Sequence, residues 1–195
     1  MGLSFIHKIG LLKTPLLAAW HWDARQKFGR IKPVLSPGAG ILDIGSGYGT
    51  VTEVLKSNGF EVTAVDVEDQ SVRPELKPMV CDGAALPFPS RSFDFSLLLT
   101  VLHHTPEPAK VLSEAARVAE KVLVIEDVYS NKLQQYLTYF TDSLLNFEFR
   151  GHPHSNKSRA GWQQTCQTLG LEFEVIRSDR FLLFFRQETY LITKR

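Results

Sequence analysis

Residues 41–50 read ILDIGSGYGT, and the prediction of the fold starts from them. The apolar residues at the start of this stretch predict a short buried strand, which the charge of Asp43 interrupts. Gly45, Gly47 and Gly49 then alternate through a turn, and a helical pattern follows. Glycine is needed where a backbone bends through positive φ or approaches a ligand closely. Such a turn at a helix N-terminus aims N–H groups and a positive dipole end at a ligand, so we expect a binding site here rather than an ordinary tight turn.

The spacing of these glycines differs from the dinucleotide fingerprint G-x-G-x-x-G, whose third glycine would fall on Thr50. The segment DIGSGYG instead resembles motif I of the class I S-adenosyl-L-methionine (SAM)-dependent methyltransferases. The resemblance runs from about residue 41 to residue 128 through LPFPSRSFDF, VLHHTPEP and VLVIEDV, in matching order and spacing. It is closest to the group called methyltransferase type 11, and it implies SAM as the cofactor.

Strand and helix patterns alternate along the chain, which predicts an α/β fold with a parallel sheet covered by helices on both faces. Strands are expected at residues 41–44, 61–67, 79–81, 93–101, 122–128, 171–177 and 189–193. The last two suit a closing antiparallel hairpin. Together with the resemblance, this pattern predicts a Rossmann-like class I methyltransferase fold, with a mostly parallel seven-stranded sheet and an antiparallel last strand.

The length and composition fit one globular domain. The chain has 195 residues, of which 44% are hydrophobic and 22% charged. We expect an N-terminal helical segment at 1–33, a SAM-binding core at 34–130, a lid or substrate segment at 131–160, and a closing helix and strands at 161–195. The two cysteines lie far apart, so neither a disulfide framework nor a metal site is expected, and a reducing cytoplasm fits.

Polar residues at the carboxyl ends of the expected strands are the candidates for cofactor binding. Asp66 closes the second strand, where its carboxylate suits two ribose hydroxyls, although a helix cap is the alternative. Asp82 and Gly83 follow the third strand and equally suit a plain turn. The resemblance implies that Asp82 receives the adenine amino group and that the next N–H meets a ring nitrogen. It also implies cofactor contacts for a further set of residues: Asp43, Gly45, Ser46, Gly47, Gly49, Val67, Thr100 and Val101.

The residues for catalysis are less specified, because SAM already carries an activated methyl group and the protein mainly positions an acceptor. A base is needed only if the acceptor must lose a proton. His104 is our expected base, since imidazole titrates near neutrality. His103, Asp127 and Tyr136 are expected substrate contacts, and Glu126 is a further plausible one.

Two segments outside the resemblance remain open. Residues 1–33 carry six basic residues against one acidic residue and show helical periodicity, with Pro15 expected to break or start a helix. They suit either a helix packed on the domain or one lying on a membrane surface. Residues 131–149 place apolar side chains on one helical face, which suits either a lid over an apolar acceptor or a part of the core.

The sequence therefore predicts a SAM-dependent methyltransferase acting on a small-molecule acceptor. A SAM-binding partner or regulator without catalysis is the alternative. A nicotinamide oxidoreductase is disfavoured by the missing third glycine. The net charge of +1 gives no bulk field for nucleic acid, and no nucleic-acid partner is expected. No apolar run approaches the ~20 residues of a membrane span, so only peripheral membrane contact stays open.

Overall fold

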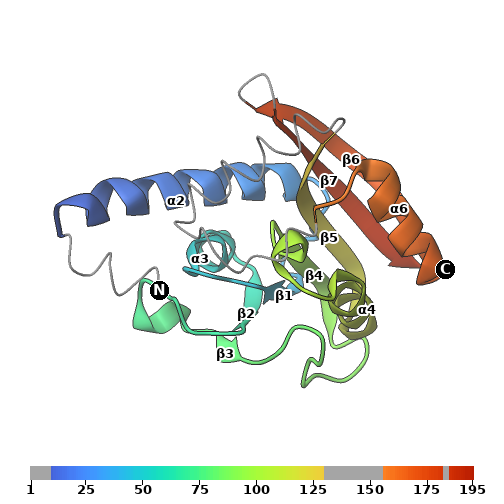
Figure 1. Cartoon of the computed structure of the whole chain (residues 1–195). Coiled ribbons are helices and arrows are strands. Elements are labelled where there is room, and N and C mark those ends of the chain that lie inside the picture. The colour runs from blue at the N-terminus through green and yellow to red at the C-terminus, as the bar shows by residue number, and fades with distance from the viewer. Residues whose placement is uncertain (1–9, 130–155, 182–184) are drawn as a thin grey trace.

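The structure, a computed structural model, describes residues 10–129, 156–181 and 185–195. These residues form a seven-stranded sheet in the order β3-β2-β1-β4-β5-β7-β6, with helices on both faces (Figure 1). The strands from β3 to β5 pair in parallel, and β7 pairs antiparallel with both of its neighbours. The predicted fold class is thus confirmed. The strands are β1 Gly40–Ile44, β2 Glu61–Asp66, β3 Met79–Val80, β4 Phe93–Leu99, β5 Ala119–Val128, β6 Leu171–Phe181 and β7 Phe185–Lys194.

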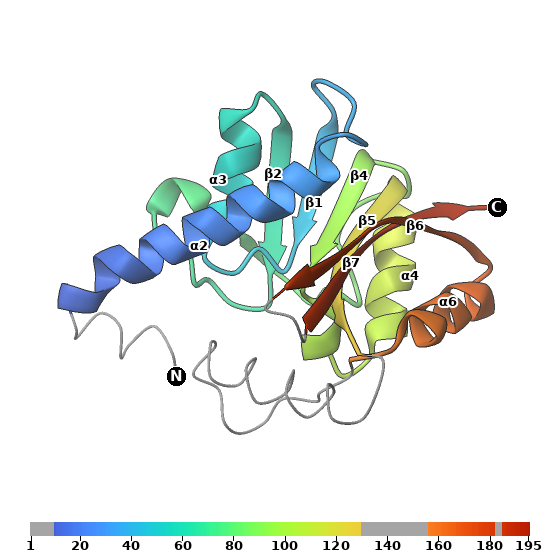
Figure 2. The ribbon, with the colours of Figure 1, turned by 90° about the horizontal axis from the view of Figure 1, so that it is seen from above.

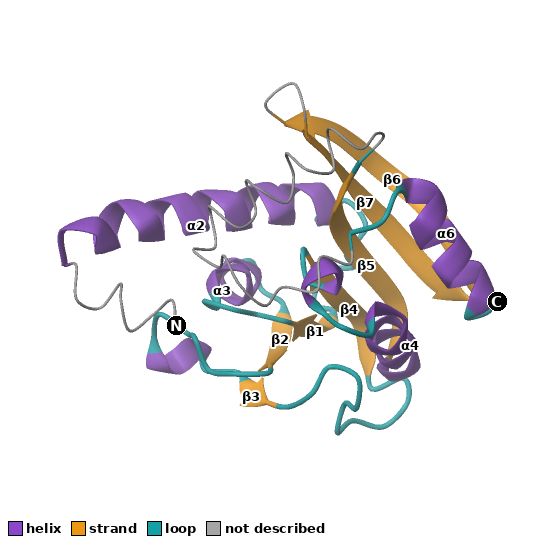
Figure 3. Cartoon of the chain, viewed as in Figure 1, coloured by secondary structure: helices purple, strands orange, loops and turns teal. Residues whose placement is uncertain are grey.

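Helices cover the two faces of the sheet as separate layers (Figure 2, Figure 3). The α2 and α3 helices lie on one face, and α4 and α6 lie on the other. Their bounds are α2 Gly10–Ile31, α3 Thr50–Ser57, α4 Pro108–Val118 and α6 Arg159–Thr168. Two single 3₁₀ turns complete the set, η1 Pro74–Leu76 and η2 Leu102–His104.

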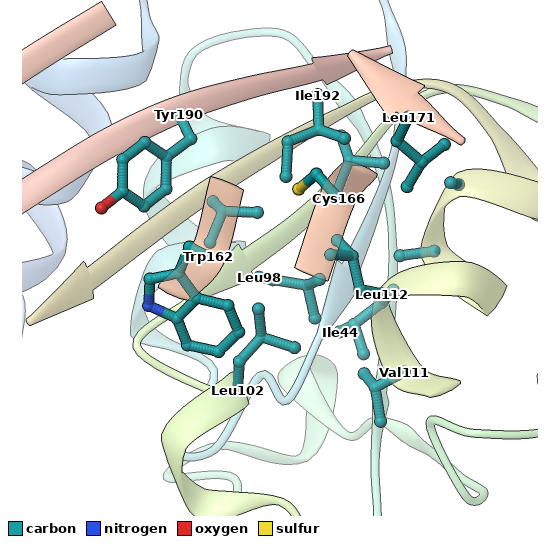
Figure 4. Packing of buried hydrophobic residues seen from close by; sticks show 14 of the residues in the cluster. Ile44, Leu98, Leu102, Val111, Leu112, Trp162, Cys166, Leu171, Tyr190 and Ile192 are labelled. Carbon is teal, nitrogen blue, oxygen red and sulfur yellow. The ribbon is translucent and has the colours of Figure 1, made fainter. Parts of the chain in front are cut away.

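The β5 strand shows how one sequence serves both layers. Val122 and Val124 pack with α4 and α6, whereas Leu123 and Ile125 pack with α2 and α3. This alternation follows from the period of two along a strand, and a near-continuous apolar run is what a strand buried on both faces requires. On the α4 and α6 face, Trp162 fills the space next to Leu102 and Tyr190 (Figure 4).

The position of β1 between β2 and β4 fixes where a ligand can bind. From β1 the chain connects to β2 on one side, while β4 lies on the other, so the sheet order reverses at β1. The loops leaving the carboxyl ends of β1 and β4 therefore diverge, and this edge of the sheet is where folds of this kind bind ligands. The glycine turn follows β1, and η2 follows β4, so both lie at this point.

Some element boundaries differ from the prediction for physical reasons. The α2 helix runs through Pro15, although a proline beyond the first turn removes one backbone hydrogen bond and strains the helix. The β5 strand begins at Ala119 rather than 122, because Ala119 pairs with Phe93. The last two strands are longer than predicted, since their pairing continues to Phe181 and Phe185.

The packing of α2 answers part of the open question about the N-terminal segment. Ala24, Phe28 and Ile31 are buried against the domain. The opposite end of the helix extends past the edge of the sheet in both views (Figure 1, Figure 2). Within the described ranges, no helix combines the length and the apolar character needed to cross a membrane.

Candidate cofactor-binding site

The turn after β1 has a backbone that demands glycine. Gly45, Gly47 and Gly49 have φ values of 73°, 52° and 77°, all in the left-handed region. A Cβ at Gly45 would lie 2.7 Å from a methyl of Val101, and one at Gly49 would lie 2.8 Å from Cβ of Leu76. All three glycines therefore suit a left-handed backbone, and Gly45 and Gly49 also allow close packing.

The turn also holds polar groups that suit a ligand. It leads directly into α3, whose first turn carries the N–H groups of a helix N-terminus. The hydroxyl of Ser46 is buried and has no hydrogen-bond partner in the part of the chain that the structure describes. Because a buried polar group without a partner is costly, this hydroxyl is suited to a bound polar ligand.

Asp66 joins the end of β2 to the glycine turn. Its Oδ2 accepts a hydrogen bond of 2.7 Å from the Gly47 N–H, and its Oδ1 accepts one of 2.7 Å from the Val67 N–H. Oδ1 also accepts a longer hydrogen bond of 3.5 Å from the Glu68 N–H, whereas Oδ2 keeps a second lone pair that can accept from a ligand hydroxyl. The predicted ribose acid is therefore at the turn, beside Val67, whose side chain is largely exposed.

Asp43 is a buried acid below the same turn. Thr52 of α3 donates a hydrogen bond of 2.6 Å to its Oδ2. Burial raises the pKa of the Asp43 carboxyl to about 6, and the Thr52 hydrogen bond and the charge of Lys27 oppose this rise only in part. A cation placed beside Asp43 would be stabilised by the carboxylate and would favour its ionised form.

Lys27 lies at the same edge of the sheet, although no sequence pattern indicated it. It reaches from α2 to the end of β4, where its Nζ donates a hydrogen bond of 2.9 Å to Thr100 Oγ1. It also pairs with Asp23 at 2.9 Å. Thr100 has a φ of 63°, an uncommon conformation for a β-branched residue and one often found at functional sites. The basic character of residues 1–33 was visible in the sequence, but the partner 73 residues away was not.

Asp82 and Gly83 lie in the turn that follows β3. Asp82 Oδ1 accepts a hydrogen bond of 2.9 Å from the Ala84 N–H, and its carbonyl accepts one of 3.0 Å from the Ala85 N–H. This is the turn geometry that the sequence left open. This turn leaves the Asp82 side chain exposed. The Cys81 N–H donates a hydrogen bond of 2.9 Å to the Asp66 carbonyl, so Asp66 and Asp82 lie at the same edge of the sheet.

The two adjacent histidines of η2 have different surroundings. His103 is buried, and its Nδ1 lies 2.5 Å from Oε2 of the buried Glu126. His104 is half-buried, with its ring centroid 4.0 Å from that of His103. The structure thus places Glu126 beneath the turn rather than at its surface.

Asp127 points to the other face of the sheet from Glu126, because successive strand residues alternate. Its Oδ1 accepts a hydrogen bond of 3.0 Å from Gln187 of β7. Burial raises the pKa of Asp127, while His103, Gln187 and Lys27 act in the opposite direction. Tyr136 and the segment 131–149 lie outside the described residues. The other predicted site residues gather at the carboxyl edge of β1, β2, β3, β4 and β5.

Known proteins resemble the chain in sequence over this region. Residues 42–122 match a family model described as a methyltransferase domain. A demethylmenaquinone methyltransferase from Renibacterium salmoninarum is 30% identical over 117 residues, which cover 56% of this chain and 49% of that protein. A ubiquinone biosynthesis O-methyltransferase from Paramagnetospirillum magneticum is 30% identical over 99 residues, which cover 45% of this chain and 40% of that protein. The chain spans no more than half the length of these two relatives.

Solved structures resemble the fold over most of the chain. The YcgJ protein from Bacillus subtilis has a TM-score of 0.70 and 16% identity, covering 88% of this chain and 99% of that one. The magnesium protoporphyrin IX methyltransferase from Synechocystis PCC 6803, solved with bound S-adenosylhomocysteine, has a TM-score of 0.63 and 16% identity, covering 95% and 88%. At these identities the likeness supports the fold.

The two kinds of constraint on the glycine turn are separable by mutation. We expect Gly47→Ala, which meets no atom within 4 Å, to cost only the left-handed backbone strain, ~1–2 kcal/mol. Gly49→Ala adds the close approach to Leu76, so we expect it to cost a further ~1–3 kcal/mol. Urea unfolding of the two variants measures the difference, and equal losses would show that close packing at Gly49 plays no part.

Proposed function

We propose that this chain is a class I SAM-dependent methyltransferase that transfers a methyl group to a small, largely apolar acceptor. The fold and the match of residues 42–122 to a methyltransferase domain support this proposal. The observation that carries the proposal is the convergence of three features on the reversal point of the sheet. These are the left-handed glycine turn, the Asp66 carboxylate bonded to it, and the buried Asp43 facing Lys27.

The arrangement of these groups suits the two halves of SAM. We propose that Asp66 binds the ribose hydroxyls, with Val67, Asp82 and Gly83 beside the adenine. The glycine turn, with Gly45, Ser46, Gly47 and Gly49, then follows the cofactor toward β4. The amino-acid end of SAM carries both an ammonium and a carboxylate. The acidic Asp43 and the basic Lys27 stand close enough to affect each other electrostatically, as a site for both charges requires.

We further propose that the backbone of Thr100 and Val101 contacts this amino-acid end. Thr100 adjoins Lys27 through its hydroxyl, and the Val101 side chain packs over Gly45. The two residues therefore lie between the glycine turn and α2. Their carbonyl groups are suited to accept hydrogen bonds from an ammonium.

The chemistry of transfer puts few demands on the side chains. SAM, when bound, supplies a methyl group on a sulfonium sulfur, which is a reactive leaving group. The protein must hold the acceptor atom in line with that methyl group and keep water away. We propose His104 as the base for an acceptor that loses a proton, with His103 and Asp127 near the acceptor. Tyr136, in the segment that the structure does not describe, stays a proposed acceptor contact.

The acceptor class is proposed from the relatives. The names of two of them refer to demethylmenaquinone and to ubiquinone biosynthesis. A quinone precursor is a small ring compound with apolar substituents, and it agrees with the apolar residues of the 131–149 segment.

Calorimetry and methyl transfer together test the function. We expect S-adenosylhomocysteine, the product form of the cofactor, to bind and NAD not to bind, because Thr50 replaces the third glycine of the dinucleotide motif. Transfer of labelled methyl from SAM to a short-chain demethylmenaquinone then tests the acceptor class. NAD binding without S-adenosylhomocysteine binding would contradict the family assignment. Cofactor binding without transfer to any acceptor from cell extracts would favour the non-catalytic alternative.

A substitution at Asp66 tests the ribose contact. We expect Asp66→Ala to weaken S-adenosylhomocysteine binding by ~1.5–3 kcal/mol, the range for hydrogen bonds to a charged group. Part of this loss would come from freeing the Gly47 N–H. Asp66→Asn keeps an oxygen for the Gly47 N–H but turns its NH₂ donor toward the Val67 N–H, so we expect an intermediate loss of affinity. An unchanged affinity in both folded variants would remove Asp66 from the site.

The pKa of Asp43 gives a test by pH. Because its folded-state pKa of about 6 lies above its ordinary value of 3.8, the ionised carboxylate costs stability, which falls as pH rises through this interval. An ammonium bound beside Asp43 lowers the pKa again. We therefore expect binding of S-adenosylhomocysteine at pH 6 to release about half a proton, as a half-protonated group does on ionising.

Calorimetry in two buffers of different ionisation enthalpy measures this proton release. Asp43→Asn is the control, since its amide cannot ionise and should abolish the release. Proton uptake by the wild-type protein, or a release that persists unchanged in Asp43→Asn, would mean that the ammonium binds elsewhere.

A further inference from the structure

Glu126 is a buried carboxylate with three partners, all in the turn after β4. Its Oε1 accepts hydrogen bonds from the Val101 N–H at 3.1 Å and from the Leu102 N–H at 2.8 Å. Its Oε2 lies 2.5 Å from Nδ1 of His103. Its side chain is 0% exposed, and burying a charge is favourable only when hydrogen bonds of this kind satisfy it.

These bonds fix the direction of a neighbouring carbonyl group. In a planar trans peptide, the N–H and the C=O point in opposite directions. The Val101 N–H points to Glu126, so the carbonyl of Thr100, in the same peptide unit, points away from Glu126. The side chain of Thr100 meets Lys27 of α2. Glu126 thus holds this peptide unit from below, on the side opposite the proposed amino-acid end.

The peptide unit needs such support, because Thr100 has the left-handed φ of 63°. This conformation is costly for a β-branched residue and persists only where the surroundings enforce it. Three contacts from two elements, β5 and α2, enforce it here. The Thr100 N–H bonds to the Ile125 carbonyl at 2.7 Å, its hydroxyl bonds to Lys27, and its peptide with Val101 bonds to Glu126.

We propose that Glu126 is a positioning residue for cofactor binding. It acts through the peptide units of residues 100–102 and aims the Thr100 carbonyl at the ammonium of the cofactor. This inference rests on the proposed function. It gives Glu126 a role in cofactor binding, whereas the sequence suggested a contact with the acceptor.

The sheet provides a matched control. Glu188 of β7 lies directly opposite Glu126 of β5 in the antiparallel register. It is also 0% exposed, and it accepts hydrogen bonds from Arg159, from Ser178 at 3.1 Å and from Tyr190 at 2.8 Å. These partners lie in α6, β6 and β7, away from the turn after β4. A loss of ligand affinity that is common to variants at positions 126 and 188 would therefore reflect the loss of a buried carboxylate alone.

Two ligands that differ only in the amino-acid end provide the readout. We expect Glu126→Met to weaken S-adenosylhomocysteine binding at least about tenfold, as the loss of an aligned partner for a charged group implies. We expect no comparable change for 5′-methylthioadenosine, which lacks the ammonium and the carboxylate. Glu126→Gln should restore most of the affinity, because its amide oxygen still accepts from both N–H groups and its NH₂ can donate to the other tautomer of His103. Glu188→Met should lower stability without separating the two ligands.

Several results would overturn the proposal. Equal losses for the two ligands in Glu126→Met, or the same pattern in Glu188→Met, would reduce Glu126 to a structural role. Wild-type protein that does not bind S-adenosylhomocysteine would instead remove the proposed function, and the inference with it. Hydrogen exchange of the wild-type protein provides a test that needs no variant. The amides of Val101 and Leu102 should exchange as slowly as those of β4, and rapid exchange would show that Glu126 does not hold them.

Discussion

The approach of Gly45 to Val101 is the constraint on which the candidate cofactor site depends. The two residues follow neighbouring parallel strands, and there is no room for a side chain at position 45. This contact sets the distance between the turn after β1 and the turn after β4. Asp66 then secures the first turn from β2, and Glu126 secures the second from β5. Four adjacent strands therefore contribute to one rigid edge, whose backbone groups are fixed before any ligand arrives.

Carboxylates at the end of β5 divide this edge between the two faces of the sheet. Glu126 and Glu188 lie on the α4 and α6 face, with His103 and Arg159 as their basic partners. Asp127 and Gln187, one position along each strand, lie on the α2 face, where Arg30 donates a hydrogen bond to Gln187. Each face of the sheet thus carries hydrogen-bonded polar side chains at the end of β5. Since each acid has hydrogen-bond donors, burial is compatible with a stable fold.

The sequence was sufficient for the fold and for the residues of the glycine turn, because local patterns carry that information. The alternation of strands and helices predicted the layers, and the spacing of Gly45, Gly47 and Gly49 predicted left-handed turns that the structure contains. Lys27 and Glu126 were different. Their roles arise from partners 73 and 25 residues away, and neither residue type has a pattern that identifies such a contact. Asp82 can form the turn and still bind a ligand, because an Asx turn uses only one of its two carboxylate oxygens.

The order of the strands has a consequence for how the protein folds during synthesis. The β7 strand follows β6 along the chain, yet it lies between β5 and β6 in the sheet. Until β7 emerges from the ribosome, the edge of β5 presents unpaired backbone groups along its apolar run from Val122 to Ile125. Exposed edges of this kind attract other strands and favour aggregation. The nascent chain therefore has β1, β4 and the turns that follow them in place while the edge of β5 is still unprotected, and a molecular chaperone would have the most effect in that interval.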